Sequence, residues 1–367
     1  MRFGIYSEMQ TPPGASHVDR FRGELALIEQ ADALGFDVYS VIEHHFFEAF
    51  SISANPLALF AAAAARTSRI RFRTALHTLP LQHPLRLAGE IAVVDILTGG
   101  RLECGLGRGH AWLYPPSNVP FEESRPRFDE AVELLLLAWS RDRFSYRGRF
   151  YSVEDVSVVP KPLQRPHPPL STGGTSDQSY RVAGERGWSL LLPPTRPYGT
   201  FAPRLSLYRE ACRRGGHTPD VIVIRPVYLT DDAASARSDV EPYLRNFFAF
   251  NASPMDPLAS PDVRAEMHAK GFAHYASGAM EALRDATYDA AVGEGIAFVG
   301  TPEAVARDLM RFGHEDGVGE LAIVASFGGL PFERARRTQE LFAKRVIPLL
   351  RAGGSRSDAE GRHRWEP

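Results

Sequence analysis

Residues 43–45 place a carboxylate and two imidazoles in succession, Glu43, His44 and His45, at the end of an apolar run. Such groups bind metals or move protons, and they are costly to bury without a partner. In a strand, side chains alternate, so His44 would project to one side and Glu43 and His45 to the other. A metal needs converging ligands, and H-E-x-x-H or H-x-H spacing is absent. The pattern favours one imidazole that transfers a proton, and no metal site. The alternative is a histidine that only forms hydrogen bonds at the end of the strand and has no role in catalysis.

A second stretch with chemical potential is STGGTSDQS, residues 171–179. Its two glycines let the backbone approach an anion closely, and its hydroxyl residues precede or begin a predicted helix. A helix N-terminus adds a favourable dipole and unsatisfied N–H groups. Serine and threonine are also favoured as plain helix caps, but this combination exceeds what a cap requires. It favours phosphate binding through Gly173, Gly174, Thr175, Ser176 and Ser179.

The elements that must position these residues alternate along the chain: short β-type runs are each followed by an amphipathic run. Eight such pairs predict an α/β fold, a (β/α)₈ TIM barrel. A doubly wound open sheet is disfavoured because no glycine-rich turn follows the first strand, and GLGRGH lacks the third fingerprint glycine. The predicted strands span residues 2–7, 37–45, 69–76, 101–109, 169–174, 188–194, 221–230 and 320–329.

In barrels of this kind the chemistry lies at the C-terminal ends of the strands. The sequence is polar at those ends, at Glu43 to His45, His77, Arg108, His110 and Thr172 to Ser176.

We expect a single domain over residues 1–351 with a hairpin excursion at 143–160 and an insertion at about 251–299, between the seventh and eighth strands. Within the insertion, 251–283 is rich in Pro, Ser and Ala with few large anchors, which predicts a mobile lid; a surface excursion without a role is equally open. Residues 352–367 are expected to form a disordered tail.

Composition fits an ordinary globular protein, with 44% hydrophobic and 23% charged residues. A net charge of −2 argues against nucleic acid or an anionic membrane as partner. Two cysteines cannot form a disulfide framework, and neither a signal core nor a membrane span is visible. We therefore expect a cytoplasmic protein.

Several motifs together resemble the bacterial luciferase family, flavin-dependent monooxygenases built on a (β/α)₈ barrel. They are EHHF (43–46), NP (55–56), TALHTLP (74–80), HPLRLAGEIAVVDILTGGRLECGLGRG (83–109) and GGTS (173–176), in this order. The long segment ending in GGR and GLGRG is the most specific, and the similarity covers nearly the whole chain.

The resemblance implies roles for individual residues. His44 matches the family's active-site histidine, and Ala75–Leu76 matches a non-proline cis peptide beneath the isoalloxazine. In luciferase a cysteine stands where this chain has Gly107, which implies less bulk near the flavin. A glutamate is usual there at the position of Thr175. Positions implied to contact the FMN phosphate or its surroundings are Arg108, Gly174, Thr175, Ser176 and Ser179.

The implied function is that of a two-component monooxygenase. Reduced FMN from a separate flavin reductase would react with O₂ to give a C4a-hydroperoxide that oxidises a small organic substrate, with His44 as proton-transfer partner. The family also implies a homodimer formed through the second and third helices, where the AAAAA run (61–65) would let another helix approach closely.

Three alternatives stay open. The same fold could use the deazaflavin F420 for hydride transfer, or the protein could be a non-catalytic flavin-binding relative. A metal-dependent barrel hydrolase would use Glu43, His45, His77 and His110 as ligands.

Overall fold

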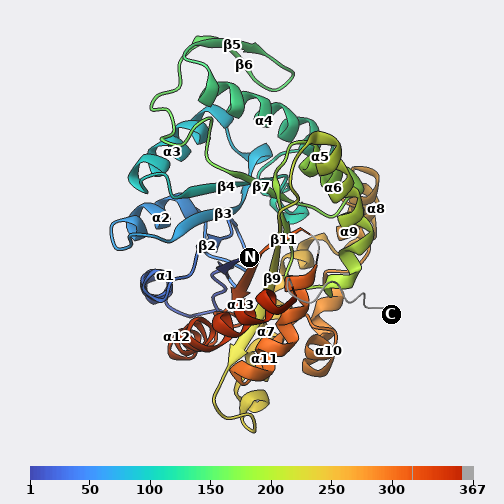
Figure 1. The fold of residues 1–367 in the computed structure, drawn as a ribbon. Helices are drawn as coiled ribbons and strands as arrows, with labels where there is room; N and C mark the ends of the chain where they lie inside the picture. Colours follow the sequence, from blue (N-terminus) through green and yellow to red (C-terminus); the bar gives the residue numbers. More distant parts are fainter. Residues whose placement is uncertain (316, 358–367) are drawn as a thin grey trace.

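Eight parallel strands close into a barrel in the computed structural model, which describes residues 1–315 and 317–357 (Figure 1). Around the barrel the order is β1, β2, β3, β4, β7, β8, β9 and β11, and β11 pairs back onto β1. This confirms the predicted TIM barrel with an insertion between its seventh and eighth strands. The barrel strands are β1 (Arg2–Ser7), β2 (Val38–Val41), β3 (Arg71–Thr78), β4 (Leu102–Gly107), β7 (Leu170–Gly173), β8 (Ser189–Leu192), β9 (Val221–Leu229) and β11 (Val318–Val324).

Helices surround the barrel and alternate with its strands along the chain (Figure 1). The first six are α1 (His17–Leu34), α2 (Pro56–Ala64), α3 (Pro84–Leu97), α4 (Ser124–Ser140), α5 (Asp177–Glu185) and α6 (Ala202–Gly215). The later ones that flank the barrel are α7 (Ala236–Ala252), α11 (Pro302–Leu309), α12 (Phe332–Leu341) and α13 (Ile347–Ser357).

Local sequence signals account for several helix ends. Ser16 caps α1 by accepting a hydrogen bond from the Asp19 N–H, and Gly35 ends the helix with a φ of 84°. Asn55 caps α2, whose first residue is Pro56, where a missing N–H costs nothing. Both helix ends therefore follow from local residue preferences.

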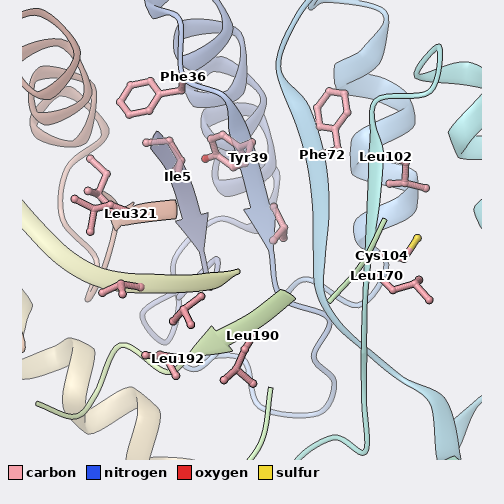
Figure 2. Packing of buried hydrophobic residues seen from close by; sticks show 14 of the residues in the cluster. Ile5, Phe36, Tyr39, Phe72, Leu102, Cys104, Leu170, Leu190, Leu192 and Leu321 are labelled. Carbon is pink, nitrogen blue, oxygen red and sulfur yellow. The ribbon is translucent and has the colours of Figure 1, made fainter. Parts of the chain in front are cut away.

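The main hydrophobic core lies between the barrel strands and the surrounding helices, and Figure 2 shows part of it. On β1, Phe3 and Ile5 belong to this layer, while Tyr6 belongs to a second cluster with Ala75 and Leu191. This is the alternation expected of a barrel strand, whose even and odd side chains face opposite sides.

An ion-pair network joins three strands of the barrel. The guanidinium of Arg73 on β3 pairs with Glu103 on β4 at 2.5 Å and with Glu320 on β11 at 2.6 Å. Burial acts against the charge of Arg73, but the two carboxylates hold the pKa of the guanidinium above its usual value. The paired charges therefore tie together strands that are far apart in the sequence.

The hairpin excursion and the insertion both form regular structure. The hairpin consists of antiparallel β5 (Phe144–Arg147) and β6 (Ser152–Val156), as predicted. The connection from β9 to β11 contains, besides α7 and α11, the short helices α8 (Pro261–Ala269), α9 (Ala273–Ala276) and α10 (Tyr288–Gly293) and a strand, β10 (Phe298–Gly300), which pairs with β9.

The expectation that residues 251–283 lack large anchors is wrong. Met255, Leu258, Met267 and Phe272 are buried in one cluster with residues that follow β2 and β4. Two methionines, a leucine and a phenylalanine supply this packing. The high content of Pro, Ser and Ala around them conceals these few large apolar residues.

At the C-terminus, α13 extends through Ser357 and so covers the first residues of the tail predicted over 352–367. Residues 358–367 lie outside the described residues. Among the described residues, no helix combines the length and the apolar character needed to cross a membrane.

Candidate functional site

A cavity of about 610 Å³ lies at the carboxyl ends of the barrel strands. Its wall is formed by residues at or beyond the ends of β1, β2, β3, β4, β7 and β8, and by part of the insertion. All eight predicted site residues line this one cavity: His44, Ala75, Leu76, Arg108, Gly174, Thr175, Ser176 and Ser179.

His44 is 1% exposed, and its ring is held by aromatic neighbours. The indole N–H of Trp112 donates to Nε2 of His44 at 3.3 Å, and the ring of Phe50 meets it edge-on with centroids 4.4 Å apart. Because an indole nitrogen only donates, Nε2 of His44 must accept, and the proton of the neutral imidazole lies on Nδ1. Nδ1 has no hydrogen-bond partner among the described residues.

The environment keeps His44 neutral. Burial, followed by the positive charge that His110 and His45 could carry, lowers its pKa well below the usual value. His110 lies in the same aromatic cluster, with its ring centroid 4.3 Å from that of Trp112, and burial followed by His274 lowers its pKa to about 4. The imidazoles of His44 and His110 are therefore both neutral at pH 7.

Glu43 belongs to a separate network that ties β2 to β3. Its carboxylate contacts Nδ1 of His77 at 2.6 Å and Nε2 of His45 at 3.6 Å, and accepts from Nε2 of Gln82 at 2.5 Å. Burial alone would raise the pKa of Glu43, but hydrogen bonds from His45 and His77 lower it to about 2.

The three groups at 43–45 thus separate as predicted, with His44 on one side. The predicted strand is too long, however: β2 ends at Val41, and the segment beyond it is anchored by the His44 N–H donating to Ser53 O at 2.9 Å. His110, the fourth candidate metal ligand, lies with His44 and Trp112 rather than with Glu43. Among the described residues, no group of three or more His, Cys, Asp or Glu could hold a metal ion.

The peptide bond between Ala75 and Leu76 is cis, as the family resemblance implied. It falls within a register shift between β3 and β4, which separates the pairing of Thr74 from that of His77. A Cβ at Gly107 would lie 2.7 Å from Cδ1 of Leu76, so Leu76 occupies the space beside this glycine. The bulk expected to be missing at Gly107 is thus supplied by Leu76.

The glycine–hydroxyl loop joins β7 to α5. Ser176 caps α5, and its Oγ lies 2.9 Å from Oγ of Ser179. A Cβ at Gly174 would come within 2.5 Å of Ser179, so only glycine fits there without a shift. The loop therefore presents a close-packed helix N-terminus to the cavity, and Ser176 is a helix cap as well as a cavity residue.

Four arginines surround this loop. Arg125 donates to Oγ of Ser179 at 3.2 Å, Arg204 pairs with Asp177 at 3.0 Å, and Arg196 lines the cavity. Arg108 has no carboxylate partner among the described residues. Burial, followed by the charge of Arg108, lowers the pKa of Arg125 more than the carboxylate of Asp129 raises it.

Of these arginines only Arg108 belongs to a motif that the sequence reveals. Arg125, Arg196 and Arg204 come from helix starts and a loop whose sequence carries no motif. Trp112 was missed for the same reason, although its place two residues beyond His110 was a usable signal.

The insertion closes one side of the cavity. Arg108 donates to the Gly271 carbonyl at 3.3 Å, and its guanidinium lies 4.8 Å from the ring centroid of Phe272. Tyr275 meets the ring of Trp112 edge-on at 5.5 Å. Phe272 and Tyr275 are thus packed against residues that follow β4.

With this geometry in place, comparison with known families is decisive. The model of the luciferase-like monooxygenase family matches residues 1–320. The chain belongs to this family.

Individual relatives of the luciferase-like chain agree with the assignment. The oxygenase component of the flavin-dependent trigonelline monooxygenase of Acinetobacter baylyi is 26% identical over 282 residues, covering 72% of this chain and 78% of its own. The structure of the monooxygenase RslO1 from Streptomyces bottropensis superposes with a TM-score of 0.77 at 30% identity, covering 95% and 99% of the two chains. The F420-dependent tetrahydromethanopterin reductase of Methanopyrus kandleri, at 20% identity and a TM-score of 0.65 over 95% and 98%, shares the fold.

Proposed function

We propose that this protein is the oxygenase component of a two-component monooxygenase, which uses reduced FMN and O₂ to oxidise a small organic substrate. The observation that carries the proposal is one cavity that combines a cluster of arginines around the N-terminus of α5 with a buried, neutral His44. The flavin-dependent trigonelline enzyme, named as an oxygenase component, supports the two-component arrangement and a separate flavin reductase as partner.

The residues around the β7–α5 loop fit the phosphate of FMN. Arg108 and Arg125 are cations without a carboxylate partner among the described residues, and the N–H groups at the start of α5 face the same loop. Hydroxyls of Thr175, Ser176 and Ser179 would add hydrogen bonds, which are strong when the acceptor is charged. An anion bound here would balance the positive charge.

The ring system would lie on the wall formed by the Ala75–Leu76 peptide, where apolar side chains border the cavity. Bound reduced FMN would supply the electrons that activate O₂. The protein would bind and orient the flavin, hold the substrate beside it, and keep water out.

His44 is suited to donate or receive a proton within this cavity. Its Nδ1–H is buried and has no partner among the described residues, so no existing hydrogen bond would have to break for it to donate to a bound molecule. Trp112 holds the opposite nitrogen and fixes the tautomer. Proton transfer to or from His44 would therefore take place at Nδ1.

The insertion supports the exclusion of water. Phe272 and Tyr275 cover the cavity beside Arg108 and Trp112, so that a bound flavin and substrate would be enclosed. A site open to bulk water would favour release of hydrogen peroxide over oxidation of the substrate.

A binding titration with reduced FMN, oxidised FMN and F420 tests this proposal. We expect reduced FMN to bind most tightly and to support oxygen consumption that depends on an added flavin reductase. Preference for F420 would instead indicate hydride transfer on the same fold. Tight FMN binding without substrate-dependent oxygen use, across a panel of candidate substrates, would indicate a flavin-binding protein.

A further inference from the structure

Two acidic O–H groups border the cavity at the end of β1. Tyr6, on β1, projects to the side opposite Phe3 and Ile5, which pack toward the helices, and Glu8 follows directly after the strand. Both line the cavity, and their side chains are otherwise buried, with exposures of 6% and 3%. The proposed mechanism uses neither.

A fixed network orients the carboxyl of Glu8. Its Oε2 accepts from Nε2 of Gln10 and from Nδ2 of Asn251, each at 3.0 Å. The two amides cannot be reversed without loss: Gln10 Oε1 accepts from the Gly328 N–H at 2.8 Å, and both amide nitrogens also donate to the Phe247 carbonyl. Oε2 of Glu8 is therefore an acceptor.

A proton on Glu8 must then lie on the other oxygen, Oε1, which has no hydrogen-bond partner among the described residues. Burial raises the pKa of Glu8 to about 8, against the lowering effect of the hydrogen bonds from Asn251 and Gln10. Burial, followed by the charge on Glu8, also raises the pKa of Tyr6 well above its usual value. At pH 7 both groups carry an O–H.

We propose that Tyr6 and Glu8 form a pair of O–H donors that binds a carbonyl-type oxygen, and that this oxygen belongs to the organic substrate. Two donors on the wall of one cavity, with Ala75, Leu191 and Ile224 packed in the same lining, are costly to leave without an acceptor. A single oxygen with two lone pairs satisfies both, and negative charge that develops on it strengthens both bonds. The inference rests on the proposed function in taking the occupant to be the molecule that is oxidised.

The place of the pair in the barrel separates it from the anion site. β1 and β7 are opposite each other in the strand order, four strands apart in either direction, and the arginine-lined loop follows β7. A flavin anchored there by its phosphate would extend across the cavity, with the substrate beyond or beside its ring. The flavin also carries carbonyl oxygens, so the test must distinguish the two sources.

A cationic group fits this wall less well. It would require Glu8 to ionise in a buried position, in a cavity whose wall already contains Arg108, Arg196 and Arg204. An amine should therefore bind only when Glu8 is ionised, whereas a ketone of equal size should bind when Glu8 is protonated.

The probes for the test are acetophenone, ethylbenzene and 1-phenylethylamine, which share one shape and differ in the polar group. Affinity is measured with and without oxidised FMN, and the C=O stretch of ¹³C-labelled acetophenone is recorded by infrared difference spectroscopy. The wild type should prefer acetophenone to both other probes. Tyr6→Phe and Glu8→Leu should each weaken acetophenone roughly three- to tenfold, leave ethylbenzene unchanged, and move the C=O stretch toward its free value.

Tyr228→Phe is the matched control. Tyr228 is buried in the same cluster as Tyr6, but its hydroxyl donates to Asp239 outside the cavity wall. It should leave the binding of all three probes unchanged.

Glu8→Gln distinguishes a donor from a carboxylate. The N–H groups of Gln10 and Asn251 would draw the new amide oxygen to the position of Oε2, leaving its NH₂ to face the cavity. Acetophenone affinity should stay within a few-fold of wild type at pH 7. Above pH 8 the wild type should lose affinity as Glu8 ionises, whereas Glu8→Gln should not. Of the groups packed against Glu8, Gln10, Asn251 and the Phe247 backbone are uncharged, and Tyr6 titrates only at higher pH.

Three outcomes would overturn the inference: equal affinity for acetophenone and ethylbenzene, preference for 1-phenylethylamine, or variants that weaken FMN instead of acetophenone. The last would assign the oxygen to the flavin. Failure of the wild type to bind FMN, with the acetophenone results intact, would remove the proposed function and leave the donor pair standing.

Discussion

The indole of Trp112 donates to Nε2 of His44 over 3.3 Å, and this one contact fixes which nitrogen of His44 carries the proton. The donor comes from the segment after β4 and the acceptor from the segment after β2, so the tautomer depends on the barrel bringing both strand ends together. Nδ1 is left as an N–H without a partner among the described residues.

His44→Ala should keep reduced-flavin binding within a few-fold but slow substrate oxidation by roughly two to four orders of magnitude, the range for a general acid–base group. Single-turnover kinetics with reduced FMN measure both. His45→Ala is the control, because His45 faces Glu43 and should matter less. A dispensable His44 with an essential His45 would reverse the assignment.

Trp112→Phe should change the pH dependence rather than abolish activity. Without the indole donor, Nε2 of His44 is free to take up a proton, so the pKa of His44, now held low chiefly by burial, should rise. Activity that requires neutral His44 should then fall at a higher pH than in the wild type as the medium is acidified. An unchanged acidic limb in the rate profile would show that the contact does not tune His44.

Glu8→Gln should stabilise the protein near neutral pH. The folded protein keeps a proton on Glu8 up to a pKa of about 8, while the unfolded chain releases it near the ordinary value of 4.5. Stability therefore falls as pH rises between these values, and a glutamine avoids this loss. We expect a gain on the order of 2–4 kcal/mol at pH 8 and little at pH 4, measured by denaturant unfolding. An equal effect at both pH values would contradict the shifted pKa.

FMN should bind at least a hundredfold more tightly than riboflavin, because several charge-assisted hydrogen bonds of roughly 1.5–3 kcal/mol each reach the phosphate. Arg108→Ala should remove most of this preference with little effect on riboflavin. Arg86→Ala, at an exposed arginine paired with Glu90 on α3, is the control. Equal affinities for FMN and riboflavin in the wild type would refute the anion site.

The sequence predicted the barrel and the location of the site because both depend on repeated or local patterns. Short β-type runs alternate with amphipathic runs along the chain, and GGTS or EHH marks chemistry within a few residues. His44, Gly174 and Ser179 could be found in this way, and all three line the cavity.

What could not be predicted depends on long-range packing. Glu8 resembles any polar residue after a strand until Asn251, far along the chain, is seen to hold it. Arg125 and Trp112 belong to no sequence motif. Each is recognised only from the hydrogen bond that it donates, Arg125 to Ser179 and Trp112 to His44. The buried anchors of 251–283 were hidden because a few apolar side chains among small ones give no clear period.

A dimer formed through α2 and α3 is expected from the family resemblance, and the surface of α3 supports it. Val93, Ile96 and Leu97 are 43%, 44% and 59% exposed on that helix. Ala63 on α2 packs inward, while Ala62 and Ala65 are exposed. Light scattering should show a dimer that Leu97→Glu weakens and Leu349→Glu, on α13, does not. A monomeric mass for the wild type at micromolar concentration would remove the idea.

The insertion should keep water away from the flavin, so that turnover oxidises the substrate and releases little hydrogen peroxide. Phe272 connects the insertion to Arg108, since its ring lies over the Arg108 guanidinium and meets Tyr114 and Phe121 at 5.2 and 5.4 Å between centroids. Removing a buried phenylalanine costs on the order of 3–5 kcal/mol, enough to open a small segment locally while the barrel stays folded.

Phe272→Ala should therefore be cleaved faster than the wild type within 251–283 in limited proteolysis, and reduced FMN should slow cleavage in both. It should also divert turnover from product to hydrogen peroxide, because water then reaches the flavin. His268→Ala, at an exposed position on α8, should leave both readouts unchanged. A Phe272→Ala protein that is cleaved faster but still couples oxygen use to substrate oxidation would show that the insertion covers the cavity without excluding water.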